Sequence, residues 1–115
     1  MINPNLTING NAITEEKEIE TYFSMDQFTC AVDDNWLEVE FSKERGAFIG
    51  WGNVDEDIFY FDNGSGNTDS VVLIINVCPE ERMMCYDPDV IKDIVNYFCE
   101  TGLRNPNYNW IEDTF

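Results

Sequence analysis

Apolar and polar side chains alternate most clearly near the middle of the chain. Leu37, Val39 and Phe41 fall on one side of an extended backbone. Glu38 and Glu40 fall on the other side, because successive side chains of a strand point in opposite directions. The pattern predicts an antiparallel strand with one face in the core and the other in solvent.

Similar stretches flank this strand and are separated by residues that favour turns. Residues 43–46 and 53–56 supply short turns, and segment 62–69, rich in Gly, Asn, Ser and Asp, supplies a longer loop. The run 70–77 is strongly apolar, so we expect it to be the most buried strand. In all, we expect strands around Leu6 and Ile8 and over 28–32, 36–41, 47–51, 57–62, 70–77 and 108–111.

Two segments have helical spacing instead. The first starts at Thr14, whose hydroxyl can accept from a free backbone N–H, and keeps an apolar face as far as Met25. The second has Asp87 as a candidate N-cap, Pro88 in its first turn and Gly102 as its stop. Its apolar stripe comprises Val90, Ile91, Ile94, Val95 and Phe98. These elements predict an α+β fold, an antiparallel β-sheet meander with an N-terminal and a C-terminal α-helix packed on one face.

The composition fits one folded domain spanning residues 1–115. Apolar residues make up 43% and aromatic residues 14%, unlike acidic disordered chains, which have few aromatics. The first ten residues lack the charged and apolar regions of a signal peptide, so we expect a cytoplasmic protein. We expect reduced and mostly buried cysteines, at Cys30, Cys78, Cys85 and Cys99, and the alternative is a disulfide between two of them.

The charge balance narrows the choice of partner. Asp and Glu number 23 against 6 Lys and Arg, which gives a formal net charge of −17. Phosphate repels such a chain, so we expect no binding to nucleic acid or to an anionic membrane surface. A cationic protein is favoured, because opposite fields speed encounter. The alternative is that the acidity serves solubility alone.

The residue types of common catalytic sites are largely missing. The chain has no histidine, which removes the most frequent general base and metal ligand. The cysteine spacings match no zinc finger or ribbon. Loop 62–69 has the oxygen-bearing residues Asp62, Asn67 and Asp69 but places Gly64 and Gly66 where an EF-hand has ligands. A hairpin loop is therefore the preferred interpretation, and weak calcium binding is the alternative. We therefore expect no enzymatic activity, no cofactor and no metal site.

Acidic side chains at turns and on the polar side of strand 36–41 are the candidate binding residues. Trp36 shares that side with Glu38 and Glu40, and an exposed Trp ringed by acids would suit an Arg- or Lys-rich partner. A Trp packed in the core or at a sheet edge is the alternative. The full candidate set is Trp36, Glu38, Glu40, Asp55, Glu56, Asp57, Asp62, Asp69, Glu80 and Glu81.

The C-terminal third resembles a known family. The helix that opens at Asp87-Pro88 is followed by Tyr97-Phe98-Cys99-Glu100-Thr101-Gly102-Leu103-Arg104-Asn105-Pro106 and then by Trp110. This ending resembles the immunity family numbered one of bacterial polymorphic toxin and contact-dependent growth inhibition systems. Members commonly end with a helix, a Phe-x-x-Thr-Gly-x-Arg-Pro stretch and a nearby Trp. Asn105 interrupts the usual Arg-Pro step, so the resemblance is to a divergent member.

The resemblance implies a small cytoplasmic antitoxin that neutralises a cognate toxin domain, as a monomer in a 1:1 complex. Family toxins include nucleases and deaminases, whose cationic surfaces hold nucleic acid and could be blocked by an acidic protein. One alternative is an acidic nucleic-acid mimic that inhibits a broader DNA- or RNA-binding target. Another is a small enzyme or ligand-binding domain.

Overall fold

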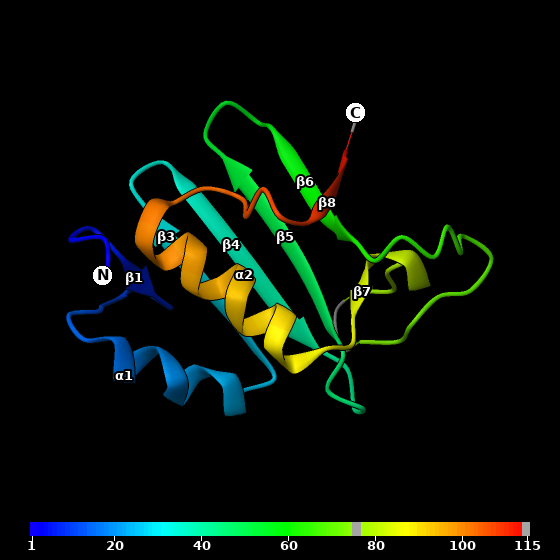
Figure 1. Cartoon of the computed structure of the whole chain (residues 1–115), viewed down its shortest axis with the longest axis horizontal. Coiled ribbons are helices and arrows are strands. Elements are labelled where there is room, and N and C mark those ends of the chain that lie inside the picture. The colour runs from blue at the N-terminus through cyan, green and yellow to red at the C-terminus, as the bar shows by residue number, and fades with distance from the viewer. Residues whose placement is uncertain (75–76, 114–115) are drawn as a thin grey trace.

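An antiparallel sheet organises the chain in the computed structural model, which describes residues 1–74 and 77–113. Four strands follow one another as a meander, β3 (Gln27–Val32), β4 (Asn35–Phe41), β5 (Ala47–Asn53) and β6 (Ile58–Asp62). Beyond β3 lie β1 (Thr7–Ile8) and then β2 (Asn11–Ala12), and β8 (Asn109–Glu112) lies beside β6. A short β7 (Met84–Cys85) pairs with the first residues of β5 (Figure 1). The predicted α+β class and antiparallel meander are confirmed.

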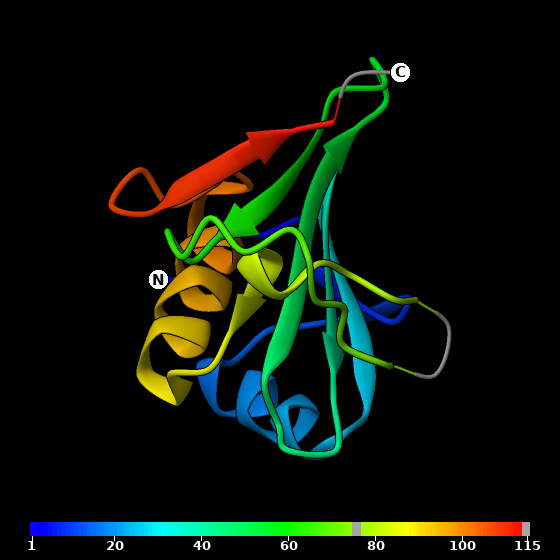
Figure 2. The same ribbon diagram turned by 90° about the vertical axis from the view of Figure 1, so that its right-hand side faces the viewer.

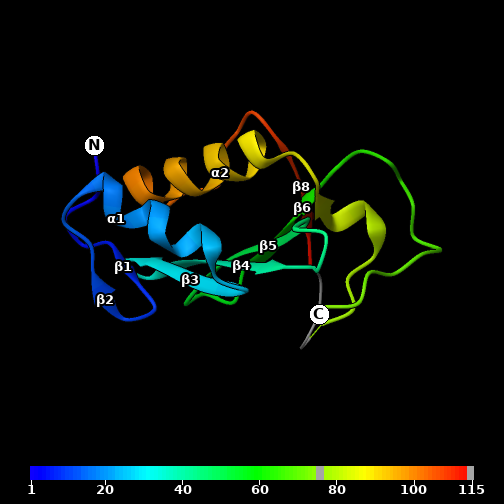
Figure 3. The same cartoon turned by 90° about the horizontal axis from the view of Figure 1, so that it is seen from below.

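Both helices lie on the same side of the strands in Figure 3. The N-terminal one is shorter than expected, because α1 (Glu16–Glu20) gives way to the 3-10 helix η1 (Thr21–Ser24). Its N-cap is Glu15 rather than Thr14, with a capping box completed by the side chain of Glu18. The C-terminal α2 (Pro88–Thr101) has the predicted ends. Asp87 accepts from the Asp89 N–H, and Gly102 closes the helix at φ 74°.

The core lies between α2 and the inner face, by which we mean the sheet face that carries Leu37 and Val39. Every second residue of β4 is buried on this face, as the alternation predicts. Aromatic rings of η1 close one side of the core, since Phe23 packs edge-on against Phe28 with ring centroids 5.7 Å apart. The buried residues of α2 are Ile91, Ile94, Val95, Phe98 and Cys99.

The prediction of a buried strand over 70–77 is wrong for the residues that the structure describes. Residues 70–74 and 77 form no strand, and the segment makes one isolated bridge, from Val71 to Glu80. Val71 is 59% exposed and Leu73 is 78% exposed. Residues 75 and 76 lie outside the described ranges. β7 and β8, not the apolar run, lie beside β5 and β6, and the run instead bonds to the residues that follow it, with the Val72 N–H donating to the Pro79 carbonyl at 2.9 Å.

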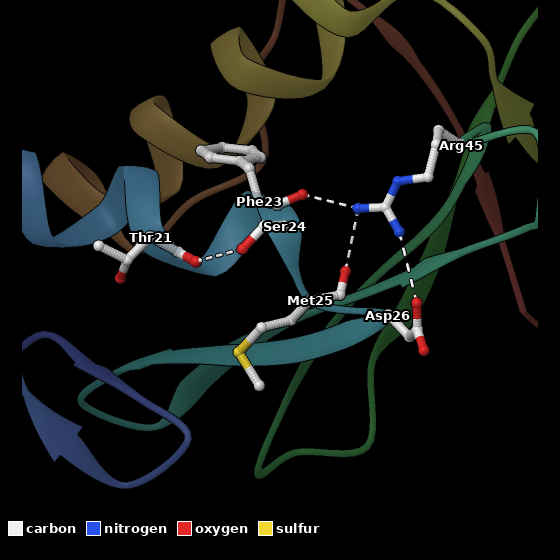
Figure 4. Close-up of polar contacts among 6 residues, drawn as sticks. All are labelled: Thr21, Phe23, Ser24, Met25, Asp26 and Arg45. Atoms are coloured by element: carbon white, nitrogen blue, oxygen red, sulfur yellow. Dashed lines mark hydrogen bonds and ion pairs between the residues drawn. The ribbon is translucent and has the colours of Figure 1, made fainter.

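Arg45 fastens the turn between β4 and β5 to the end of η1. Its guanidinium donates to the carbonyl oxygens of Phe23 and Met25 at 2.7 and 3.0 Å and lies 3.5 Å from an Asp26 carboxylate oxygen (Figure 4). The same group sits 4.1 Å from the centroid of the Phe41 ring. A cation–π contact and charge-assisted hydrogen bonds therefore hold the Arg45 side chain in place.

The stretch that carries the family resemblance is used to join α2 to the sheet. The Gly102 carbonyl accepts from Trp51 Nε1 at 3.1 Å and from Asn35 Nδ2 at 2.9 Å. Asn105 is 2% exposed, and its carbonyl accepts from Trp110 Nε1 at 3.1 Å. These polar groups are satisfied within the chain, so they support the fold rather than a ligand.

Candidate functional site

The opposite side of the sheet, which we call the open face, carries Trp36, Glu38 and Glu40 of β4. The strand register sets Trp36 beside Gly52, Glu38 beside Gly50 and Glu40 beside Phe48. Tyr60 of β6 lies beside Gly50 on the far side of β5. The pleat that buries Leu37 and Val39 thus presents these side chains together, away from α2.

Two glycines of β5 let aromatic rings lie flat on the open face. A Cβ built on Gly52 would come within 2.7 Å of three atoms of the Trp36 indole, and one on Gly50 within 3.3 Å of the Tyr60 ring. Neither glycine has a positive φ, so both are needed for space rather than for backbone conformation. Phe48 stacks on Tyr60 with centroids 5.2 Å apart and planes at 23°. We call Trp36, Phe48 and Tyr60 the aromatic shelf.

Trp36 differs from the other two tryptophans in its indole N–H. Trp51 donates to the Gly102 carbonyl and Trp110 to the Asn105 carbonyl. The Trp36 indole has no hydrogen-bond partner among residues 1–74 and 77–113, and its side chain is half-buried. Trp36 is therefore neither a core residue nor a fully exposed one: it is half-buried, and its ring lies against the backbone at Gly52 on the open face.

The carboxylates of the open face are not neutralised by the chain itself. No lysine or arginine forms an ion pair with Glu38 or Glu40 in the described part of the chain. Partial burial, and then the charge of Glu38, raises the pKa of Glu40. Burial, followed by the charge of Asp113, raises the pKa of Tyr60, whose hydroxyl donates to Asp113 at 3.2 Å. A hollow of about 390 Å³ borders Glu38 and Glu40 on the side of β3.

A second group of acids lies at the end of the sheet next to Trp36. The predicted candidates Asp55, Glu56 and Asp57 are exposed in the turn between β5 and β6. The neighbouring turn adds Asp33 and Asp34, and the Val54 N–H donates to the Asp34 carbonyl at 3.1 Å. Figure 2 shows the turn between β5 and β6 at the same end of the molecule as the end of β8. Sequence reasoning missed Asp33 and Asp34, although a two-residue acidic turn between predicted strands was their signal.

The last four candidates lie elsewhere, in and beside the loop that joins β6 to β7. Ion pairing and hydrogen bonds occupy three of them. Glu80 pairs with Arg82 at 3.1 Å, Glu81 accepts from Ser65 at 2.7 Å, and Asp62 accepts from the Gly64 N–H. The fourth, Asp69, is exposed in the same loop. The structure thus divides the ten candidates into three groups instead of one surface.

We also searched residues 1–74 and 77–113 for a metal site, for disulfides and for a membrane-spanning helix. No three His, Cys, Asp or Glu side chains there are arranged to hold a metal ion, and in loop 62–69 the Asn67 side-chain oxygen already accepts from the Asp69 and Ser70 N–H groups. All four cysteines are free, with Cys78 exposed and the others buried. No helix formed by these residues is long and apolar enough to cross a bilayer.

Comparisons with models of protein families, with curated protein sequences and with solved structures gave no match to this chain. The resemblance to the immunity family therefore stays a prediction.

Proposed function

We propose that the protein is an antitoxin that acts in the cytoplasm and neutralises one basic toxin domain, a nuclease or a deaminase, by covering its substrate-binding surface. The observation that carries the proposal is the open face. In a chain of net charge −17, that face holds a half-buried tryptophan whose indole N–H reaches solvent, beside carboxylates that form no ion pair with the residues that the structure describes.

The layout of the fold supports this role. α2 covers the inner face, where its apolar residues join the core, so the open face remains available to a partner. Aromatic residues near the centre of an interface supply much of the binding energy. The acids at the nearby turns, Asp33, Asp34, Asp55, Glu56 and Asp57, add a long-range field that raises the association rate.

Growth rescue tests the proposal. The toxin domain encoded next to this gene is expressed in a bacterial host with and without the protein, and the two purified proteins are mixed and run on a size-exclusion column. We expect restored growth and a 1:1 complex. Association should slow as salt rises, because a Debye length of about 10 Å at 0.1 M screens the acids at the turns.

Lack of both rescue and complex would refute the antitoxin function. Binding of many unrelated basic proteins with similar affinity would support the acidic nucleic-acid mimic instead, which shares the charge but not the selectivity.

A further inference from the structure

We infer that the open face recognises arginine side chains, presented on a loop of the basic partner, by stacking a guanidinium on Trp36 of the aromatic shelf next to Glu38 and by pairing a guanidinium with Glu40. The inference rests on the proposed function and adds the chemistry of the contact. It distinguishes an arginine-bearing surface from one that is merely positive.

The geometry of the shelf favours a flat cation. The Trp36 ring lies against the backbone at Gly52, where three of its atoms would meet an added Cβ, and the Tyr60 ring, stacked on Phe48, has one edge beside Gly50. Glu38 is the next residue after Trp36 on the open side of β4, and it pairs with Gly50 while Trp36 pairs with Gly52. A planar guanidinium fits such an arrangement, since it can stack on a ring and donate to a carboxylate in its own plane.

Lysine suits the same face less well. Its ammonium is a compact, strongly hydrated charge that makes no planar stack and no bidentate pair. Partial burial at Glu40 penalises a bare carboxylate there, and a ligand that replaces lost water with two directed hydrogen bonds relieves more of that penalty. Charge alone would not separate the two cations, because both carry one positive charge.

The chain already places an arginine over an aromatic ring at two other sites. Arg45 stacks 4.1 Å from the Phe41 ring centroid while binding carbonyl and carboxylate oxygens. Arg104 lies 3.4 Å from the Phe59 centroid. Arg45 thus combines a ring contact with oxygen acceptors, and the open face offers an aromatic ring and carboxylates of the same kind.

Two short peptides serve as probes, acetyl-Gly-Arg-Gly-Arg-Gly-amide and its lysine counterpart. Each is titrated into the ¹⁵N-labelled protein. Affinities are taken from the backbone amide signals of β4, which every variant retains, and the indole N–H signal of Trp36 is followed wherever the indole is present. We expect the arginine peptide to shift this signal and to bind about two- to fivefold more tightly than the lysine peptide. Trp36→Ala and the pair Glu38→Gln with Glu40→Gln should each remove the preference.

A control pair matches the loss of two charges. Glu44→Gln with Asp89→Asn changes exposed acids at the β4–β5 turn and in the first turn of α2, and it should keep the arginine preference. Equal affinity for both peptides, or shifts confined to the turns at Asp33 and Asp55, would overturn the inference.

The outcome separates the inference from the proposed function. Growth rescue without an arginine preference overturns the arginine contact and leaves the antitoxin standing. An arginine preference without growth rescue supports the arginine contact and refutes the antitoxin function.

Discussion

Trp36 and Trp51 are one strand apart in the sheet but point to opposite faces, and the same substitution should affect them very differently. Trp51 is 6% exposed and donates its indole N–H to the Gly102 carbonyl. Trp36 is half-buried and donates to no described residue. The substitutions Trp36→Phe and Trp51→Phe each remove one indole and leave one ring, so each is the control for the other.

The magnitudes follow from these contacts. At Trp51 the loss of one buried hydrogen bond is worth about 1 kcal/mol. The smaller ring leaves a gap beside Phe59 that costs a further 1–2 kcal/mol or so, about what other core truncations of this size cost. The Gly102 carbonyl still accepts from Asn35, so it is not orphaned. We therefore expect Trp51→Phe to lower the free energy of unfolding by about 2–3 kcal/mol, and Trp36→Phe by about 0.5 kcal/mol.

Urea unfolding followed by far-UV circular dichroism measures the difference without relying on tryptophan fluorescence. With a urea dependence of about 2 kcal/mol per molar, the two midpoints should differ by about 1 M. Equal midpoints, or a larger loss for Trp36→Phe, would refute the assignment of the two tryptophans to an open and a buried face.

Other substitutions test single features of the same structure. Gly102→Ala should lower the melting temperature, since φ is 74° and the new Cβ would lie 3.0 Å from Val32, a loss of about 1–2 kcal/mol. Because the pKa of Glu40 is raised in the fold, its ionised form disfavours folding at neutral pH. Glu40→Gln should then be more stable at pH 7 in chemical denaturation, and the gain should vanish below the ordinary Glu pKa of about 4.3. The hydrogen bond to Asp93 raises the pKa of Tyr108 to about 12, so this bond should stabilise the fold below pH 10 or so and be lost toward pH 12. Tyrosinate absorbance should show that Asp93→Asn moves this titration back toward its usual range.

The sequence predicted correctly those helices and strands whose signals lie within their own residues. Asp87, Pro88 and Gly102 marked the ends of α2, and all three act as predicted. The alternation along β4 assigned Glu38 and Glu40 to a solvent-facing side correctly. Such signals depend on one helix or strand alone, so no knowledge of its neighbours is needed.

The errors concern relations between segments. The run 70–77 is apolar enough for a core strand, but β7 and β8 are the segments that pair with β5 and β6, a choice that the run itself does not encode. The aromatic shelf likewise depends on the register that sets Trp36 beside Gly52, which the sequence does not display. For the same reason the ten acidic and aromatic candidates could not be sorted into three separate groups in advance.

The alternation along β4 also bears on how such a protein could diversify. Residues that hold the fold and residues that would meet a partner are interleaved in one strand but separated in space. Substitutions at Trp36, Glu38 or Glu40 leave the contacts of Leu37 and Val39 with the core in place. Descendants of this chain could exchange one partner for another while inheriting the same interior.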